Sequence, residues 1–148
     1  MMNLVKVRHN FESAHRLPQL GGKCTNLHGH SWWAEITVAG RLDERGVVVD
    51  FGLLKKSLRE WIDTHLDHGS MLGEADPLVP ALKADGTKLF LFGSAEPSKG
   101  LEWPTVENVA ELLARVTSDR IAEAGWTDVA VSRVQVTETH VNAAEVIR

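Results

Sequence analysis

The chain has 148 residues, of which 43% are hydrophobic and 24% are charged, and it carries a net charge of −4. This is the composition of an ordinary globular protein, and the length fits one domain spanning residues 1–148 with a sizeable core. The acidic balance argues against a nucleic-acid partner, and no apolar stretch approaches the ~20 residues of a membrane span. A single cysteine and no signal-peptide core favour a cytoplasmic protein.

Strands are predicted for much of the first forty residues. Residues 3–10 alternate apolar and charged side chains, as a half-buried strand does. Residues 16–27 contain a proline and two glycines and are expected to form a loop that carries Cys24. A long strand is predicted from about His28 to Ala39, with two histidines and then apolar residues at its even positions. These histidines therefore share the inward face of the strand with the core side chains.

A helix is the next predicted element. A turn over residues 41–45 and a short strand over residues 47–49 lead into Asp50. Asp50 is a good N-cap, because its carboxylate can accept hydrogen bonds from the free amides of the first helical turn. From about Phe51 to His65 the apolar residues recur at helical spacing, which predicts an amphipathic helix.

The second half of the chain is less regular. Residues 73–103 are rich in Gly and Pro, and the apolar run 89–92 is a candidate extra strand. A connection of this length is often functional, as a lid or partner contact; the alternative is a tolerated surface insertion. A second helix is predicted after its cap, Thr105, and a final strand from Val129 to about Thr139. This order predicts an α+β fold, a four-stranded antiparallel sheet with two helices on one face.

Three histidines form the most informative pattern in the sequence. His28 and His30 are two residues apart, so in a strand their imidazoles project from the same face. His15 can supply a third nitrogen from a neighbouring segment, and Cys24 is near enough in sequence to serve the same pocket. Three histidines without a fourth protein ligand describe a catalytic zinc site with one position open for water or substrate. The alternative is that they are ordinary core or surface histidines.

Six short motifs follow one another over nearly the whole chain: Phe11-Glu12-Ser13-Ala14-His15, Cys24-x-x-Leu27-His28-Gly29-His30, Val49-Asp50-Phe51, Leu66-Asp67-His68, Pro104-Thr105-Val106-Glu107-Asn108 and Glu138-Thr139. In this order they resemble the 6-pyruvoyl-tetrahydropterin synthase family. The spacing from the cysteine to the His-Gly-His motif is similar to that of the bacterial branch, the 6-carboxytetrahydropterin synthases of queuosine and other 7-deazapurine biosynthesis.

The resemblance implies a fold, an assembly and a reaction. The fold is the tunnelling fold (T-fold), in which the sheets of three subunits join into a barrel and two trimers stack as a homo-hexamer with active sites at subunit interfaces. The reaction converts 7,8-dihydroneopterin triphosphate into 6-carboxy-5,6,7,8-tetrahydropterin and releases acetaldehyde and triphosphate. The implied cofactor is Zn²⁺, and the implied partner is a small pterin substrate.

The resemblance also implies roles for nine residues. The zinc ligands would be His15, His28 and His30. The proton-transfer set would be Cys24, Asp67 and His68, and the residues at the pterin would be Glu138, Thr105 and Glu107.

Several of these residues have a structural alternative. Cys24 can be a small buried hydrophobe, Asp67-His68 a helix-end cap, and Glu107 a helix-stabilising acid. Glu138 can be a surface acid at a strand end. Because Asp67 and His68 are adjacent, their side chains need not face each other. The triphosphate needs positive charge, and the candidates by position are Arg8, Arg16, Lys23 and Arg133.

The chain also departs from the family pattern. Residues 73–103 form a much longer segment than in the compact bacterial members, the tail 141–146 lacks a tyrosine often found there, and Gly69 stands where another histidine is common.

Three further functions compete with the carboxytetrahydropterin synthase. Formation of 6-pyruvoyl-tetrahydropterin is disfavoured by the cysteine spacing. A shunt in folate synthesis is disfavoured by Cys24 itself, because those members typically carry a glutamate there. A non-catalytic zinc or pterin-binding module is the third, with segment 73–103 occluding the pocket or recruiting a partner.

Overall fold

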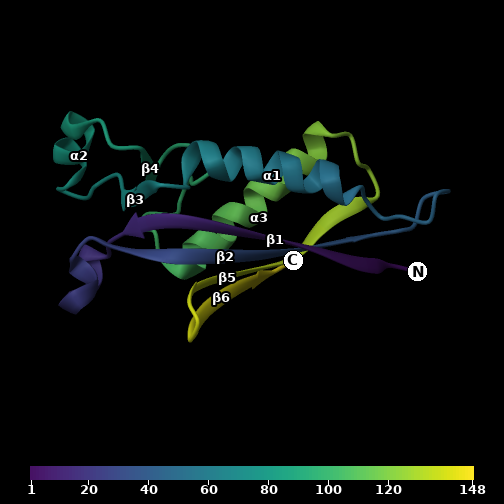
Figure 1. The fold of residues 1–148 in the computed structure, drawn as a ribbon, viewed down its shortest axis with the longest axis horizontal. Coiled ribbons are helices and arrows are strands. Elements are labelled where there is room, and N and C mark those ends of the chain that lie inside the picture. Colours follow the sequence, from purple (N-terminus) through teal and green to yellow (C-terminus); the bar gives the residue numbers. More distant parts are fainter.

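The computed structural model of the protein describes residues 1–148, and at its centre lies one mixed sheet of six strands. The strands are β1 (Asn3–His15), β2 (His28–Gly40), β3 (Gly69–Gly73), β4 (Leu89–Phe92), β5 (Val129–Thr139) and β6 (Asn142–Ile147). Their order across the sheet is β4-β3-β1-β2-β5-β6 (Figure 1). The pairs within β1-β2-β5-β6 are antiparallel, whereas β3 runs parallel to β1 and β4 parallel to β3.

Two long helices and one short helix accompany the sheet. They are α1 (Phe51–His65), α2 (Val79–Asp85) and α3 (Val106–Glu123). The buried stripes of α1 and α3 join the inward side chains of the sheet in one core of 24 buried residues. Two 3₁₀ turns, η1 (Pro18–Leu20) and η2 (Gly22–Thr25), lie in the loop between β1 and β2. The α+β class is therefore confirmed.

Both predicted helix starts are confirmed. The Asp50 carboxylate accepts a hydrogen bond from the Leu53 amide at 3.0 Å, and α1 covers the predicted residues. The Thr105 hydroxyl accepts one from the Asn108 amide at 3.1 Å at the start of α3. These caps satisfy amides that have no partner within the first helical turn.

The predicted sheet of four antiparallel strands and two helices is wrong in detail. Residues 47–49 form no strand; Val49 is buried in the core without a ladder partner, whereas Val47 is exposed. The fourth antiparallel strand is instead β6, whose weak apolar alternation in Asn142–Ile147 gave little signal. The parallel strands β3 and β4 and the short helix α2 bring the totals to six strands and three helices, and the candidate strand 89–92 is confirmed as β4.

The long β1–β2 ladder positions the end of the sheet that carries the histidines. It pairs residue for residue from Asn3 opposite Gly40 to His15 opposite His28. Because β1 continues to His15, beyond the predicted end at residue 10, its last residue stands beside the first residue of β2. Strands β3 and β4 and helix α2 gather at this same end (Figure 1).

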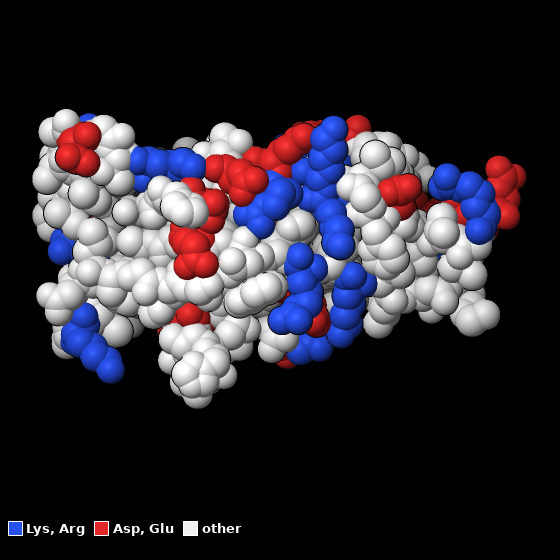
Figure 2. Space-filling view, in the orientation of Figure 1, with Lys and Arg blue, Asp and Glu red and all other residues white.

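Surface charge is mixed on the face displayed in Figure 2, where basic and acidic side chains are interspersed. This agrees with the small net charge of −4. None of the helices combines the length and the apolar character that crossing a membrane requires.

Candidate metal centre

Three imidazoles converge at the end of the β1–β2 ladder. His15 and His28 are direct cross-strand partners, and His30 follows two residues later on the same face of β2. One nitrogen from each of the three rings lies within 4.8 Å of the other two. The side chain of His15 is 1% exposed, whereas that of His30 is 18% exposed. Two strands therefore present one buried and two more accessible nitrogen donors to a common point.

Hydrogen bonds fix two of these rings in the orientation that a metal ligand needs. The carbonyl oxygen of Pro104 lies 2.8 Å from Nδ1 of His15, and the carbonyl oxygen of Asn26 lies 2.7 Å from Nδ1 of His28. A carbonyl only accepts, so each Nδ1 must donate and each Nε2 keeps a free lone pair. The Nε2 atom of His15 is buried and has no hydrogen-bond partner. A bound metal ion would satisfy this orphaned acceptor.

The electrostatics of the site also favour a metal. Burial lowers the pKa of His15 to about 4, more than the Pro104 hydrogen bond raises it, and the charges of His28 and His30 act in the same direction as burial. Burial likewise lowers the pKa of His30, against the opposing effect of Glu138. These rings are therefore neutral near pH 7, the form that binds metal ions. An all-imidazole donor set suits zinc and other first-row transition metals.

A cavity of about 410 Å³ opens beside the three histidines. Its walls come from η2, β2, β5 and the start of β6, and they consist of Lys23, Cys24, His28, His30, Glu138, Thr139 and Asn142. Cys24 is a free thiol of intermediate exposure. The Glu138 carboxylate lies 3.7 Å from Nε2 of His15 and 3.9 Å from Nε2 of His30. The structure thus brings a thiol, a carboxylate and the imidazoles into one cavity.

Asp67 and His68 lie elsewhere. They follow the end of α1, and His68 has a left-handed backbone with φ of 57°, unusual for a residue other than glycine. In this conformation Nδ1 of His68 lies 2.8 Å from the Asp67 carboxylate, so the adjacent side chains do face each other. The other Asp67 oxygen accepts a hydrogen bond from the Glu12 amide. The pair is therefore a preformed unit joined to β1.

The His68 side chain is 79% exposed and lines a shallow depression together with Glu12 and Ser31. That depression contains neither Cys24 nor Glu138. His30 lines both this depression and the cavity, but His68 and Cys24 line different ones.

Thr105 and Glu107 also lie outside the cavity. Thr105 caps α3, and Glu107 is exposed in its first turn. Sequence reasoning missed Thr139 and Asn142, which do line the cavity. The Thr139 hydroxyl accepts a hydrogen bond from the Asn142 amide in the β5–β6 turn, directly after Glu138. An irregularity in the β5–β6 pairing lies at this point, and no sequence pattern beyond the turn itself indicates it.

Of the four cations considered for a triphosphate, Lys23 alone lines the cavity. The guanidinium of Arg8 stacks over the ring of Trp33 at 5.1 Å. Arg16 and Arg133 are each paired with a carboxylate, Arg16 with Asp76 and Arg133 with Glu145.

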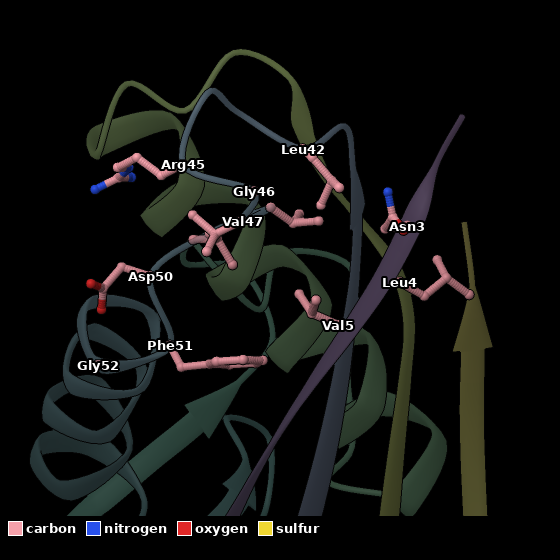
Figure 3. A pocket seen from close by; sticks show the side chains of 12 residues that line it. Asn3, Leu4, Val5, Leu42, Arg45, Gly46, Val47, Asp50, Phe51 and Gly52 are labelled. Carbon is pink, nitrogen blue, oxygen red and sulfur yellow. The ribbon is translucent and has the colours of Figure 1, made fainter.

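A larger cavity, of about 600 Å³, lies at the other end of the β1–β2 ladder (Figure 3). Its walls include Leu4, Leu42, Val47 and Phe51, and it contains no histidine or cysteine. Size alone therefore does not identify the functional site. The smaller cavity, beside the three imidazoles, is the one that groups side chains able to bind a metal or transfer protons.

Comparisons with known proteins identify the family of the chain. The family profile described as "6-pyruvoyl tetrahydropterin synthase" matches residues 4–148. A 6-carboxy-5,6,7,8-tetrahydropterin synthase from Rickettsia conorii is 40% identical over 106 residues, which cover 70% of this chain and 71% of the relative. The enzyme of that name from Synechocystis sp. is 34% identical over 131 residues, 82% of this chain and 98% of the relative.

Solved structures show the same fold. An uncharacterized protein from Wolinella succinogenes matches all of this chain and 99% of its own with a TM-score of 0.75 at 26% identity. The 6-pyruvoyl tetrahydropterin synthase of Caenorhabditis elegans matches all of this chain and 96% of its own with a TM-score of 0.69 at 22% identity. The resemblance read from the six motifs is therefore confirmed, and the chain belongs to the 6-pyruvoyl tetrahydropterin synthase family.

Proposed function

We propose that the protein is a zinc-dependent 6-carboxytetrahydropterin synthase, which converts 7,8-dihydroneopterin triphosphate to 6-carboxy-5,6,7,8-tetrahydropterin, acetaldehyde and triphosphate. The observation that carries the proposal is the single cavity that joins Cys24 and Glu138 to His28 and His30, two members of the three-histidine cluster. The relatives named as 6-carboxy-5,6,7,8-tetrahydropterin synthases, at 34–40% identity, support the choice of product. The pathway served would be 7-deazapurine (queuosine-type) biosynthesis.

In this proposal His15, His28 and His30 hold the metal. A bound zinc ion would supply Lewis-acid polarisation of oxygens on the substrate's three-carbon side chain, which makes nearby carbon-bound protons more acidic. The free thiol of Cys24 stands in the same cavity and takes such a proton as thiolate.

Glu138 anchors the pterin ring. A carboxylate can accept two parallel N–H bonds from the 2-amino group and ring nitrogen of a pterin. Glu138 lines the same cavity as Cys24, His28 and His30, which supports a substrate held by Glu138 beside the proposed metal centre. Thr105 and Glu107 remain weaker candidates for substrate contacts, because neither lines this cavity.

His68, oriented by Asp67, is proposed to return a proton to the substrate. Since His68 is exposed and lines a different depression from Cys24, we assign this role to His68 from a second copy of the chain. The unpaired edges of the sheet support such an assembly. The outer edge of β6 has no partner, and β1 meets β3 only over Ser13 to His15, which leaves most of its edge open. The proposed state is the homo-hexamer of two stacked trimers.

One observation favours a second candidate product, 6-pyruvoyl-tetrahydropterin. The 6-pyruvoyl tetrahydrobiopterin synthase of Drosophila melanogaster is 39% identical over 77 residues, which cover 43% of this chain. Occlusion of the pocket by segment 73–103, as in a non-catalytic module, is not supported, because no residue of that segment lines the cavity.

The test is a product assay. The purified protein is incubated with zinc and 7,8-dihydroneopterin triphosphate, and the products are identified by mass. Acetaldehyde and carboxytetrahydropterin are expected, whereas a pyruvoyl product would assign the second activity. No change in the substrate would refute both. Cys24→Ala is the matched control, expected to keep its zinc and to lose turnover.

A further inference from the structure

Segment 73–103 contacts the site from outside the cavity, through Asp76 and Arg16. The Asp76 side chain is completely buried, and its two oxygens accept hydrogen bonds from Nε and Nη2 of Arg16 at 2.5–3.1 Å. Arg16 directly follows the metal-ligand candidate His15. A bidentate pair of this kind fixes both the position and the orientation of the guanidinium.

Arg16, held in this way, also bonds to the loop that carries Cys24. Its Nη1 donates to the carbonyl oxygen of Thr25 at 3.4 Å, one residue beyond the thiol. The Leu17 amide donates to the carbonyl oxygen of Cys24 itself at 2.8 Å. The loop is therefore closed at its base by two bonds, one of which depends on the orientation of the Arg16 side chain.

The segment itself is firmly attached, so it can serve as a fixed support. Phe92 and Leu101 are buried members of the central core. Asp76 is held by the Leu78 amide, which donates to its carboxylate at 2.8 Å, and by its own amide, which donates to the Gly73 carbonyl. Directly after the segment, the carbonyl of Pro104 orients the ring of His15.

We propose that Asp76 is a positioning residue for Cys24: its carboxylate holds Arg16, and Arg16 holds the loop that presents the thiol to the cavity. The proposal rests on the proposed function in assigning a catalytic role to Cys24. In this proposal segment 73–103 acts as a clamp: through Asp76 it holds Arg16 in place from outside the cavity. The segment is then neither a lid nor a surface insertion without effect.

The first test measures the thiol directly, without any turnover. Asp76→Asn removes the charged partner of Arg16, and Arg16→Lys keeps the charge beside Asp76 but loses the bidentate pair and the bond to Thr25. Both variants are expected to release the loop, so that iodoacetamide alkylates Cys24 several-fold faster than in the unaltered protein. Amide exchange at Leu17 should accelerate in parallel. The matched control is Asp85→Asn, an exposed carboxylate of the same segment, which should change neither rate.

The second test measures turnover. In Asp76→Asn and Arg16→Lys, kcat is expected to fall about 10- to 100-fold with KM changed by less than about threefold, because a displaced group weakens the chemical step more than binding. Zinc content should stay that of the unaltered protein. If Asp76→Asn does not fold, Arg16→Lys decides. Alkylation and exchange at the unaltered rates in the folded variants would overturn the proposal. Should the unaltered protein turn over no substrate, the proposed function fails while the alkylation test still decides the clamp.

Discussion

The three histidines differ from Cys24 in what their removal should do. His28→Ala deletes one of three nitrogens of the proposed metal centre, so zinc content should fall from about one ion per chain to a small fraction of that. Cys24→Ala removes no ligand and should keep its zinc. Elemental analysis of the purified, unchelated variants measures the difference. A full complement of zinc in His28→Ala would contradict the assignment of the centre.

His9 should make folding stability depend on pH. It is 5% exposed, and its pKa is lowered to about 4 by burial first and then by the charges of Arg59 and Lys55. The unfolded chain therefore binds a proton at His9 between pH 6.5 and about 4 while the folded chain does not. Its contribution is complete above pH 6.5 and is lost as the pH falls to about 4, amounting to about 3 kcal/mol.

The measurement is urea unfolding at several pH values between 4 and 7. His9→Gln should flatten the dependence in this range, whereas His140→Gln, at an exposed position, should leave it unchanged. An identical pH dependence in the His9 variant and the unaltered protein would show that this group is not responsible.

At the scale of elements, substitution of Thr105 tests whether this residue acts as a helix cap or as a substrate contact. Its hydroxyl caps α3, so Thr105→Ala should lower the free energy of unfolding by about 1 kcal/mol. Because Thr105 does not line the cavity, KM for the pterin should stay within about twofold of the unaltered protein. Thr105→Ser, which keeps the hydroxyl, is the control for stability. A large rise in KM in the alanine variant would restore the pterin role that the family resemblance implies.

The elements that sequence reasoning found are those with a strong local signal. The alternating apolar residues of β2, and the N-cap and apolar stripe of α1, are patterns that a few neighbouring residues are enough to show. The bounds of both elements were predicted nearly to the residue. Of the two strands that were missed, β6 pairs with the neighbouring β5 but has weak alternation, whereas β3 depends on a distant partner. β3 is a five-residue strand that pairs with β1, more than fifty residues earlier, and its sequence Gly69–Gly73 has no alternation. Conversely, residues 47–49 have strand-like composition but no partner.

The site shows the same division. Convergence of three histidines could be predicted, since the spacing of His28 and His30 follows from the geometry of a strand. The contact between Arg16 and Asp76 could not, because sixty residues separate them and only the folded chain places them together. The contact between the side chains of Asp67 and His68 depends on the left-handed backbone conformation of His68. This conformation could not be predicted, because histidine rarely adopts it.

For the whole molecule, the separation of His68 from Cys24 predicts complementation between chains. Cys24→Ala and His68→Ala should each be inactive when pure. Unfolded together and refolded as a mixture, they should regain part of the activity, because some interfaces would then combine an intact Cys24 with an intact His68. Remixing two preparations of the same variant is the control. No recovery from a mixture that forms hexamers by light scattering would show that the two residues do not share a site across chains.

The unbroken ladder between β1 and β2 has one more consequence, for how the gene can change. Successive side chains of a strand point to opposite faces, so adding or deleting one residue between Phe11 and His15 would rotate His15 away from His28 while the hydrophobic core could remain in place. Only changes in steps of two would preserve the facing. A homologue with an odd-numbered insertion there is therefore expected to lack the proposed metal centre.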